Sequence, residues 1–284
     1  MNYLTCCIMA LLLPFSVNAS QIFLAKAKDN VLQVTAITSD IGYHNQPLIA
    51  ANGVYFTGEA GLGKNMQTDL FFYDFQSQQT RNLTNSSVSE FSPTLYPYDA
   101  GLSSVVVESD GTQRLWFYPF DTSKKPKRLY DDLKPVGYHA WGAQDDMILF
   151  MLGEPHYLYY SDRASTHRQK MADDIGRSLS YNAAARTFSF TVNADSQQWF
   201  TTLDDENKQV HRRFVLPEQV QDYTWVDENH IAYAIGAKVF RRNISNPTEI
   251  QPWYDFAEYC GQISRMNYLN ETLAFVCEQR SNEQ

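Results

Sequence analysis

The sequence lacks the sustained 3.6-residue spacing of apolar side chains that marks amphipathic helices. It is rich instead in aromatic residues, with 18 Tyr and 17 Phe, and aromatic and β-branched side chains favour strands. Its 284 residues suffice for one all-β domain, because domains of this class run to roughly 250 residues without splitting. We therefore expect a single all-β domain.

An excess of basic residues is also missing. The chain has 23 Lys and Arg against 32 Asp and Glu, a net charge of −9. A negative protein repels the phosphates of nucleic acids and the anionic lipids of membrane surfaces, so we expect neither as a partner. Residues 124–128, Lys-Lys-Pro-Lys-Arg, form a small basic cluster, which we expect to be a solvated loop.

Local motifs for hydrolysis and nucleotide binding are absent. No Gly-x-Ser-x-Gly sequence occurs, which argues against the nucleophile of an α/β-hydrolase. The run Gly61-Leu62-Gly63-Lys64 has neither the spacing nor the strand-to-helix context of a phosphate-binding loop. We expect this run to be a hairpin loop.

The one extended hydrophobic run, Leu4–Val17, is too short to span a bilayer. It ends in Val17-Asn18-Ala19, as a small-residue cleavage site would. Cys6 and Cys7 lie at the start of the run and not after it, where a lipidated cysteine would stand. We expect residues 1–19 to be a removed signal peptide. The mature protein would then be periplasmic or secreted, without stable insertion in a membrane.

Two tandem segments, Gly42–Thr84 and Ser89–Leu129, share one order of turns and strands. The matched positions are Gln46-Pro47 with Ser92-Pro93, Asn52-Gly53 with Asp99-Ala100-Gly101, Val54-Tyr55-Phe56-Thr57 with Ser104-Val105-Val106-Val107, and Leu70-Phe71-Phe72-Tyr73 with Leu115-Trp116-Phe117-Tyr118. A repeat of about 45 residues with four strands predicts a propeller blade, because one small sheet cannot bury both its faces alone.

Weaker copies of the pattern open near residues 136, 176, 221 and 263. The last copy stops after the strand Leu273–Cys277, before its outer strands. Two strands that precede the first repeat, Gln21–Ala25 and Val31–Thr35, can complete it. Because an open ring would expose strand edges, we expect residues 20–284 to form a six-bladed β-propeller closed by pairing of the N-terminal strands with the C-terminal hairpin.

Two cysteines, Cys260 and Cys277, remain in the expected mature chain. Export would place them in an oxidising compartment, where a disulfide near the ring closure can form. Two separate buried thiols fit the sequence equally well.

The repeat resembles the WD40-like repeat of the TolB-type six-bladed propellers. The resemblance rests on the polar residue and Pro before the first strand, the Asn-Gly turn, and the aromatic strand followed by Asp, as in Leu70–Asp74. It covers nearly the whole mature chain, but nothing here corresponds to the additional N-terminal domain of TolB. The resemblance implies a periplasmic binding or scaffolding protein.

A propeller brings the first strand of every blade to its central channel, so residues at the start of those strands are the candidate site. They include imidazoles, carboxylates and guanidiniums: His44, Asn45, Gln46, Glu90, Tyr138, His139, Arg177, Asp222 and Arg265. We expect a non-catalytic module that binds a peptide, a protein segment or a small polar ligand at the channel mouth. A purely structural hydrogen-bond network would give the same residue pattern.

The alternative is a metal-dependent hydrolase or lyase that uses the same channel mouth. His44 and His139 with Glu90 and Asp222 offer the imidazole and carboxylate groups that bind divalent metals. No local motif supports this set, so we expect neither a cofactor nor a resident metal.

Overall fold

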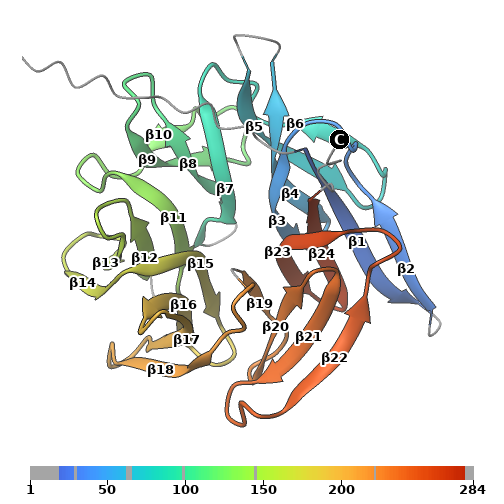
Figure 1. Ribbon diagram of the computed structural model, residues 1–284. Coiled ribbons are helices and arrows are strands. Elements are labelled where there is room, and N and C mark those ends of the chain that lie inside the picture. The colour runs from blue at the N-terminus through green and yellow to red at the C-terminus, as the bar shows by residue number, and fades with distance from the viewer. Residues whose placement is uncertain are drawn as a thin grey trace, which may run out of the picture.

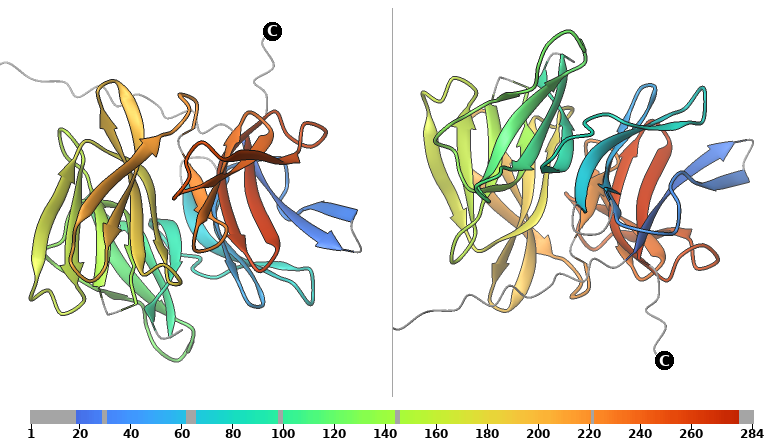
Figure 2. Two further views of the ribbon diagram at one scale, coloured as in Figure 1. Left: turned by 90° about the horizontal axis from the view of Figure 1, so that it is seen from below. Right: turned by 90° about the horizontal axis from the view of Figure 1, so that it is seen from above.

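Six four-stranded antiparallel sheets stand around a central axis in the computed structural model of the protein (Figure 1). The structure describes residues 19–28, 31–61, 66–97, 100–143, 146–220 and 222–278. Seen from below and from above, the sheets stand side by side in a ring one blade deep (Figure 2). The predicted all-β, six-bladed propeller is confirmed.

The blades are numbered 1 to 6 from the first repeat, and the strands of each blade are given in order from the axis outward. Blade 1 has β3 (His44–Ala50), β4 (Gly53–Ala60), β5 (Gln67–Asp74) and β6 (Thr80–Asn82). Blade 2 has β7 (Ser89–Leu95), β8 (Gly101–Val107), β9 (Gln113–Pro119) and β10 (Lys127–Arg128). Blade 3 has β11 (Val136–Trp141), β12 (Asp146–Met151), β13 (Tyr157–Asp162) and β14 (Arg168–Asp173).

The remaining blades follow the same plan. Blade 4 has β15 (Ile175–Asn182), β16 (Thr187–Ala194), β17 (Gln197–Asp204) and β18 (Val210–Val215). Blade 5 has β19 (Tyr223–Trp225), β20 (His230–Ile235), β21 (Lys238–Asn243) and β22 (Ile250–Asp255). Blade 6 takes β23 (Gln262–Leu269) and β24 (Thr272–Glu278) from the end of the chain and β1 (Ser20–Lys28) and β2 (Val31–Ala36) from its start.

Ring closure occurs inside blade 6. Strand β1 pairs antiparallel with β24 from Ser20 opposite Glu278 to Lys26 opposite Thr272. Figure 1 shows the blue N-terminal strands beside the red C-terminal ones. The predicted pairing of the N-terminal strands with the C-terminal hairpin is therefore confirmed.

The predicted alignment of the first two repeats holds at Gln46 and Ser92, where the first strand of each blade has a β-bulge, and it holds along the third strand. In the second strand the predicted alignment was wrong by two residues. Gly53 and Gly101 are equivalent, since each begins the second strand of its blade and lies opposite the end of the third. A Cβ at Gly53 would lie 2.1 Å from the Tyr73 carbonyl oxygen, and one at Gly101 would lie 2.2 Å from that of Tyr118. Val54 therefore matches Leu102 and not Ser104.

Three other predictions from the sequence concern the basic cluster, the Gly-Leu-Gly-Lys run and the signal peptide. Residues 124–126 of the basic cluster lie in the exposed connection before β10, while Lys127 and Arg128 form that strand. Residues 62–65 of the Gly-Leu-Gly-Lys run and residues 1–18 of the predicted signal peptide lie outside the described residues. Within the described part of the chain, no helix is long and apolar enough to cross a membrane.

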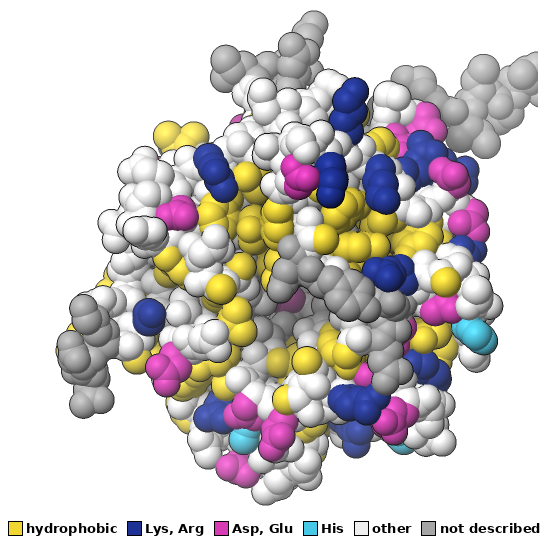
Figure 3. Space-filling model, turned by 180° about the vertical axis from the view of Figure 1, so that it is seen from behind, with side chains coloured by type: hydrophobic (Ala, Val, Ile, Leu, Met, Phe, Trp, Pro, Cys, Tyr) yellow, Lys and Arg dark blue, Asp and Glu magenta, His cyan; other side chains and the backbone are white. Residues whose placement is uncertain are grey.

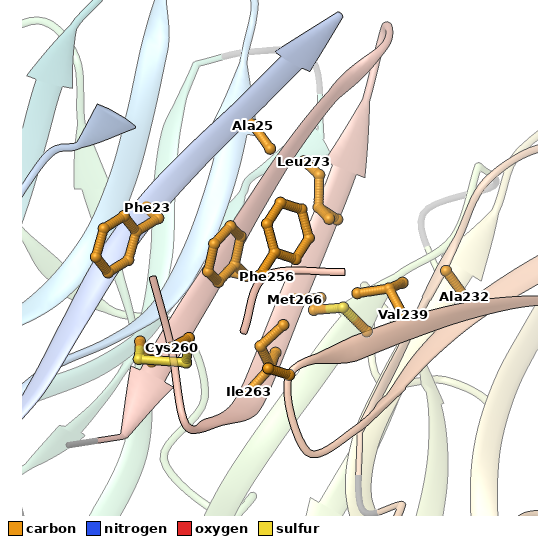
Figure 4. Packing of buried hydrophobic residues seen from close by; sticks show 12 residues of the cluster. Phe23, Ala25, Ala232, Val239, Phe256, Cys260, Ile263, Met266 and Leu273 are labelled. Atoms are coloured by element: carbon orange, nitrogen blue, oxygen red, sulfur yellow. A yellow bond between two sulfur atoms is a disulfide. The ribbon is translucent and has the colours of Figure 1, made fainter. Parts of the chain in front are cut away.

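Apolar side chains fill the spaces between neighbouring blades. Ile22, Val54 and Ala274, from blades 6, 1 and 6, are fully buried in one such cluster. Figure 4 shows another cluster, in which Leu273 of β24 lies near Phe256, while Phe23 of β1 lies on the side of the cystine at Cys260. Burial of each large apolar side chain contributes about 1.5–3 kcal/mol.

Cys260 and Cys277 form a disulfide, with their Cα atoms 5.5 Å apart. The bridge ties the loop that precedes β23 to strand β24, which pairs with β1. The disulfide therefore fastens the blade in which the ring closes, and the alternative of two free thiols does not apply.

Reduction of this disulfide should lower the free energy of unfolding. The cysteines are 17 residues apart, and a loop of that size gains about 3 kcal/mol from cross-linking in the chain-entropy account. Urea unfolding with and without dithiothreitol measures the effect. The double variant Cys260→Ala/Cys277→Ala should be insensitive to dithiothreitol. Equal stability of the oxidised and reduced proteins would show that the bridge does not secure the ring.

Candidate functional site

A cavity of about 130 Å³ lies on the axis of the ring and is lined by the inner strands of all six blades. We call it the axial cavity. Its walls are mostly polar: Gln46, Pro47, Leu48, Ser92, Pro93, Thr94, Tyr138, His139, Arg177, Ser178, Leu179, Ser180, Asp222, Tyr223, Thr224, Arg265, Met266 and Asn267. The predicted convergence of distant residues at the channel is therefore real.

The structure brings six of the nine predicted site residues to this cavity and leaves three elsewhere. The lining residues are Gln46, Tyr138, His139, Arg177, Asp222 and Arg265. Those that do not line it are His44, Asn45 and Glu90.

Two arginines and two tyrosines form the charged part of the site. The Arg265 guanidinium lies over the Tyr138 ring, 5.2 Å from its centroid, and donates to the Tyr138 hydroxyl at 3.4 Å. Arg177 reaches the cavity from β15, and within the described part of the chain it has no carboxylate partner. The positive charges of Arg265 and Arg177 both act on Tyr43.

Burial sets the protonation states of this group. It raises the pKa of Tyr43 to about 12, although the two arginines oppose the shift. Burial alone would lower the pKa of Arg265, but the electrostatic effects of Tyr138, Asp222 and Tyr43 outweigh it and raise that pKa. At neutral pH the tyrosine therefore keeps its proton as a hydrogen-bond donor, and the arginine keeps its charge.

Asp222 joins three blades. Its carboxylate accepts from the Ser178 hydroxyl at 2.6 Å and from the Met266 amide at 2.9 Å. Burial raises the pKa of Asp222, opposed first by the positive charge of Arg265. This residue therefore serves the ring as well as the cavity, because it holds blades 4, 5 and 6 together.

Gln46 and His139 also make bonds between blades. The Gln46 side-chain oxygen accepts from the Ser92 amide at 2.7 Å, which joins blades 1 and 2. His139 lies 2.6 Å from the Ser103 hydroxyl, to which the Trp141 indole donates at 2.8 Å. Burial lowers the pKa of His139 to about 3, so its ring is neutral.

The His139 arrangement is repeated in the ring. In blade 5, the Tyr223 hydroxyl and the Trp225 indole both bond to the Ser189 hydroxyl of blade 4 at 2.9 Å. Trp141 and Trp225 are both buried between blades, and each indole donates a hydrogen bond across the joint.

Some buried polar atoms around the axis have no hydrogen-bond partner. Within the residues that the structure describes, these include the Ser92 hydroxyl and the Nδ1 atom of His139, both of which line the axial cavity. The Ser264 hydroxyl is also unpaired and lines a second cavity of about 160 Å³. Asp222 and Arg265 line both cavities, so the two spaces adjoin. Unpaired buried polar atoms call for a ligand or ordered water.

His44 and Asn45 do not line the axial cavity. The His44 ring nitrogen Nδ1 lies 3.0 Å from the Ser20 carbonyl oxygen, and the His44 amide donates to the Ser20 hydroxyl at 3.1 Å. His44 therefore connects blade 1 to the first strand of the chain. The Asn45 side chain accepts from the following amide, that of Gln46, at 2.7 Å. Burial lowers the pKa of His44.

Glu90 was also misplaced, because it is fully buried between blades 1 and 2. Its carboxylate accepts from the Ser86 hydroxyl at 2.5 Å, the Thr84 hydroxyl at 3.0 Å and the Tyr118 hydroxyl at 3.1 Å. Side chains on a strand alternate between the two faces of the sheet, and a blade turns those faces to its neighbours rather than to the axis. The Glu90 side chain therefore points into the joint between blades.

The proposed metal ligands are not brought together. His139 and Asp222 line the axial cavity, but His44 and Glu90 do not. Within the described ranges, no group of three or more His, Cys, Asp and Glu side chains is placed to hold a metal ion. The arrangement favours binding of an anion at the arginines.

Sequence reasoning missed Tyr43, whose hydroxyl lies within the electrostatic reach of both arginines. Tyr43 lies one residue before β3, just outside the window of matched positions. An aromatic residue at the entry of the first inner strand was the available signal.

Comparison with known proteins establishes the fold. No family model matches the sequence, and no curated protein matches it. A TolB-type protein from Agrobacterium tumefaciens superposes with a TM-score of 0.71 at 11% identity over 92% of this chain and 99% of its own. TolB from Acinetobacter baumannii gives 0.56 at 15% identity over 75% of this chain and 60% of its own. The nidogen/laminin complex gives 0.56 at 7% identity over 90% and 84%. The fold is that of the TolB-type propellers.

Replacing Glu90 by Gln should change how stability depends on pH. Burial raises the pKa of Glu90 to about 7 from 4.5, so the folded protein holds a proton that the unfolded chain has released between these values. The contribution of the Glu90 carboxyl to the free energy of unfolding is therefore complete below the pKa of the unfolded chain, and it is lost as the pH rises through about 7. Between about pH 5 and pH 8, Glu90→Gln should gain roughly 3 kcal/mol relative to the wild type, measured by urea unfolding. A constant difference across this range would contradict the burial effect.

Proposed function

We propose that the protein is an exported, non-catalytic binding module whose axial cavity takes a carboxylate group. The group would belong to a peptide, a protein segment or a small polar ligand. The observation that carries the proposal is the presence of two arginines, Arg177 and Arg265, in the lining of the axial cavity, with the Tyr138 hydroxyl bonded to Arg265.

The charge of the cavity supports an anionic ligand. Two guanidiniums face one carboxylate there, that of Asp222, and the Asp222 carboxylate is already bonded to blades 4 and 6. The chain as a whole carries a net charge of −9, so a positive site at its centre stands out against its surroundings. Hydrogen bonds from guanidinium to carboxylate are among the strongest that side chains make.

The size of the cavity limits what can enter. The axial cavity of about 130 Å³ and the adjoining one of about 160 Å³ hold a side chain, a chain end or a small acid. A whole folded partner would have to bind across the mouth and insert one group. The unpaired Ser92 hydroxyl and His139 Nδ1 offer further hydrogen bonds to such a group.

Export is supported by two observations. The disulfide between Cys260 and Cys277 suits an oxidising compartment, and residues 1–19 have the composition of a signal peptide. A protein partner is supported by the likeness to a propeller solved in the nidogen/laminin complex. We therefore favour a periplasmic or secreted protein that binds a segment of another protein.

Arg177→Gln should weaken binding of a carboxylate while leaving the melting temperature within about 1 °C of the wild type, because Arg177 is exposed and has no ion-pair partner among the described residues. The probes are dye-labelled tripeptides, each made with a free carboxyl terminus and as the amide. Fluorescence anisotropy should show the acid binding at least about tenfold tighter than the amide, and Arg177→Gln should remove this difference.

The matched control is Arg212→Gln, which removes an exposed arginine from β18 of the same blade and should leave binding unchanged. Failure of every free-acid tripeptide to bind, equal binding of acids and amides, or equal loss in the control would refute the carboxylate site.

A further inference from the structure

A second concave surface lies between blades 1 and 2, away from the axial cavity. It is a groove of about 470 Å³, which we call the basic groove. Its lining includes four large apolar and two cationic side chains: Leu70, Leu83, Leu102, Phe120, Arg81 and Lys124. These residues come from the first two repeats, and the groove shares none of them with the axial cavity.

The floor of the basic groove is apolar, and apolar side chains continue to its rim. Leu70 and Leu102 are buried at 0% and 2% exposure. Leu83 is 37% exposed and Phe120 is 43% exposed, so both offer apolar surface to a partner. The Phe120 ring stacks on Tyr55 at a centroid distance of 5.9 Å, so this rim is ordered rather than splayed into solvent.

Positive charge borders this apolar surface. Arg81 lies over the Phe72 ring at 5.4 Å and, within the described part of the chain, forms no ion pair with a carboxylate. Lys124 is 3.4 Å from Asp121, and both of these side chains are largely exposed. Among the described residues that line the groove there is no Asp or Glu. Figure 3 shows one face of the ring, on which hydrophobic side chains are gathered with Lys and Arg, and also some Asp and Glu, among them.

We propose that the basic groove docks an acidic segment of another protein, with one large apolar side chain of that segment seated between Leu83 and Phe120. Charge complementarity selects the occupant, because the described lining carries two cationic side chains, Arg81 and Lys124, and the carboxylate that pairs with Lys124, Asp121, is itself exposed. An apolar anchor with charged flanks is a common form of segment recognition. An anionic membrane is the weaker candidate, since the surface is concave and the whole chain is acidic.

The test uses a dye-labelled hexapeptide with two acidic residues on each side of a Phe-Leu pair, capped at both ends to remove its terminal carboxylate. The Arg177→Gln variant detects any binding of its side-chain carboxylates in the axial cavity. Anisotropy should show binding that Arg81→Glu/Lys124→Glu weakens at least about tenfold. Phe120→Ala should also weaken it, because the apolar contact is lost. A peptide with Lys in place of each acidic residue should not bind.

The control double variant Lys26→Glu/Arg212→Glu reverses one exposed Lys and one exposed Arg outside the groove and should change the affinity by less than about twofold. Arg177→Gln should also leave it unchanged, which separates this proposal from the axial site. The proposal is overturned if the acidic hexapeptide does not bind, if the control weakens binding equally, or if phosphatidylglycerol vesicles bind through Arg81 and Lys124 while the peptide does not.

Discussion

The fold depends on the hydrogen bonds between β1 and β24, which complete blade 6 from opposite ends of the chain. Without them, β24 and β1 would present unpaired edges, and the apolar joint that contains Ile22, Val54 and Ala274 would open to water. The disulfide and the bonds of His44 to Ser20 lie at the same closure. These partners are nearly a full chain length apart in sequence, so the closing step carries a large entropic cost and should come late in folding.

Residues of the axial cavity differ in whether they hold neighbouring blades together. Gln46, His139 and Asp222 bond one blade to the next, so their polarity is explained by the ring itself. Arg177 and Tyr43 have no such bonds between blades among the described residues, and Arg265 contacts mainly the Tyr138 ring across the channel. Arg265 thus joins blades 6 and 3, and Arg177 is the cationic residue whose presence in the cavity is not explained by bonds that hold the ring together.

The sequence was sufficient for the architecture but only partly for the site. Turn residues and strand alternation located the blades, and the surplus strands at both ends located the closure, because both signals are local. Side-chain direction was harder. Gln46 and Ser92 lie at bulges with φ of 56° and 55°, and a bulge decides which neighbours face the axis and which face the next blade. Glu90 lies two residues before such a bulge, and its side chain therefore points into the joint between blades. Tyr43 was not predicted as a site residue for the same reason, because its direction could not be read from the sequence.

The shared blade 6 has a topological consequence. Ser20 and Glu278 are direct partners across two paired strands, so the first and last residues of the described ring are about 5 Å apart. A short turn could link them, and new termini could be opened after Val215, in the connection between blades 4 and 5. Such a circular permutant would carry each sheet on one uninterrupted stretch and keep every wall of the axial cavity, because the propeller itself has no first blade.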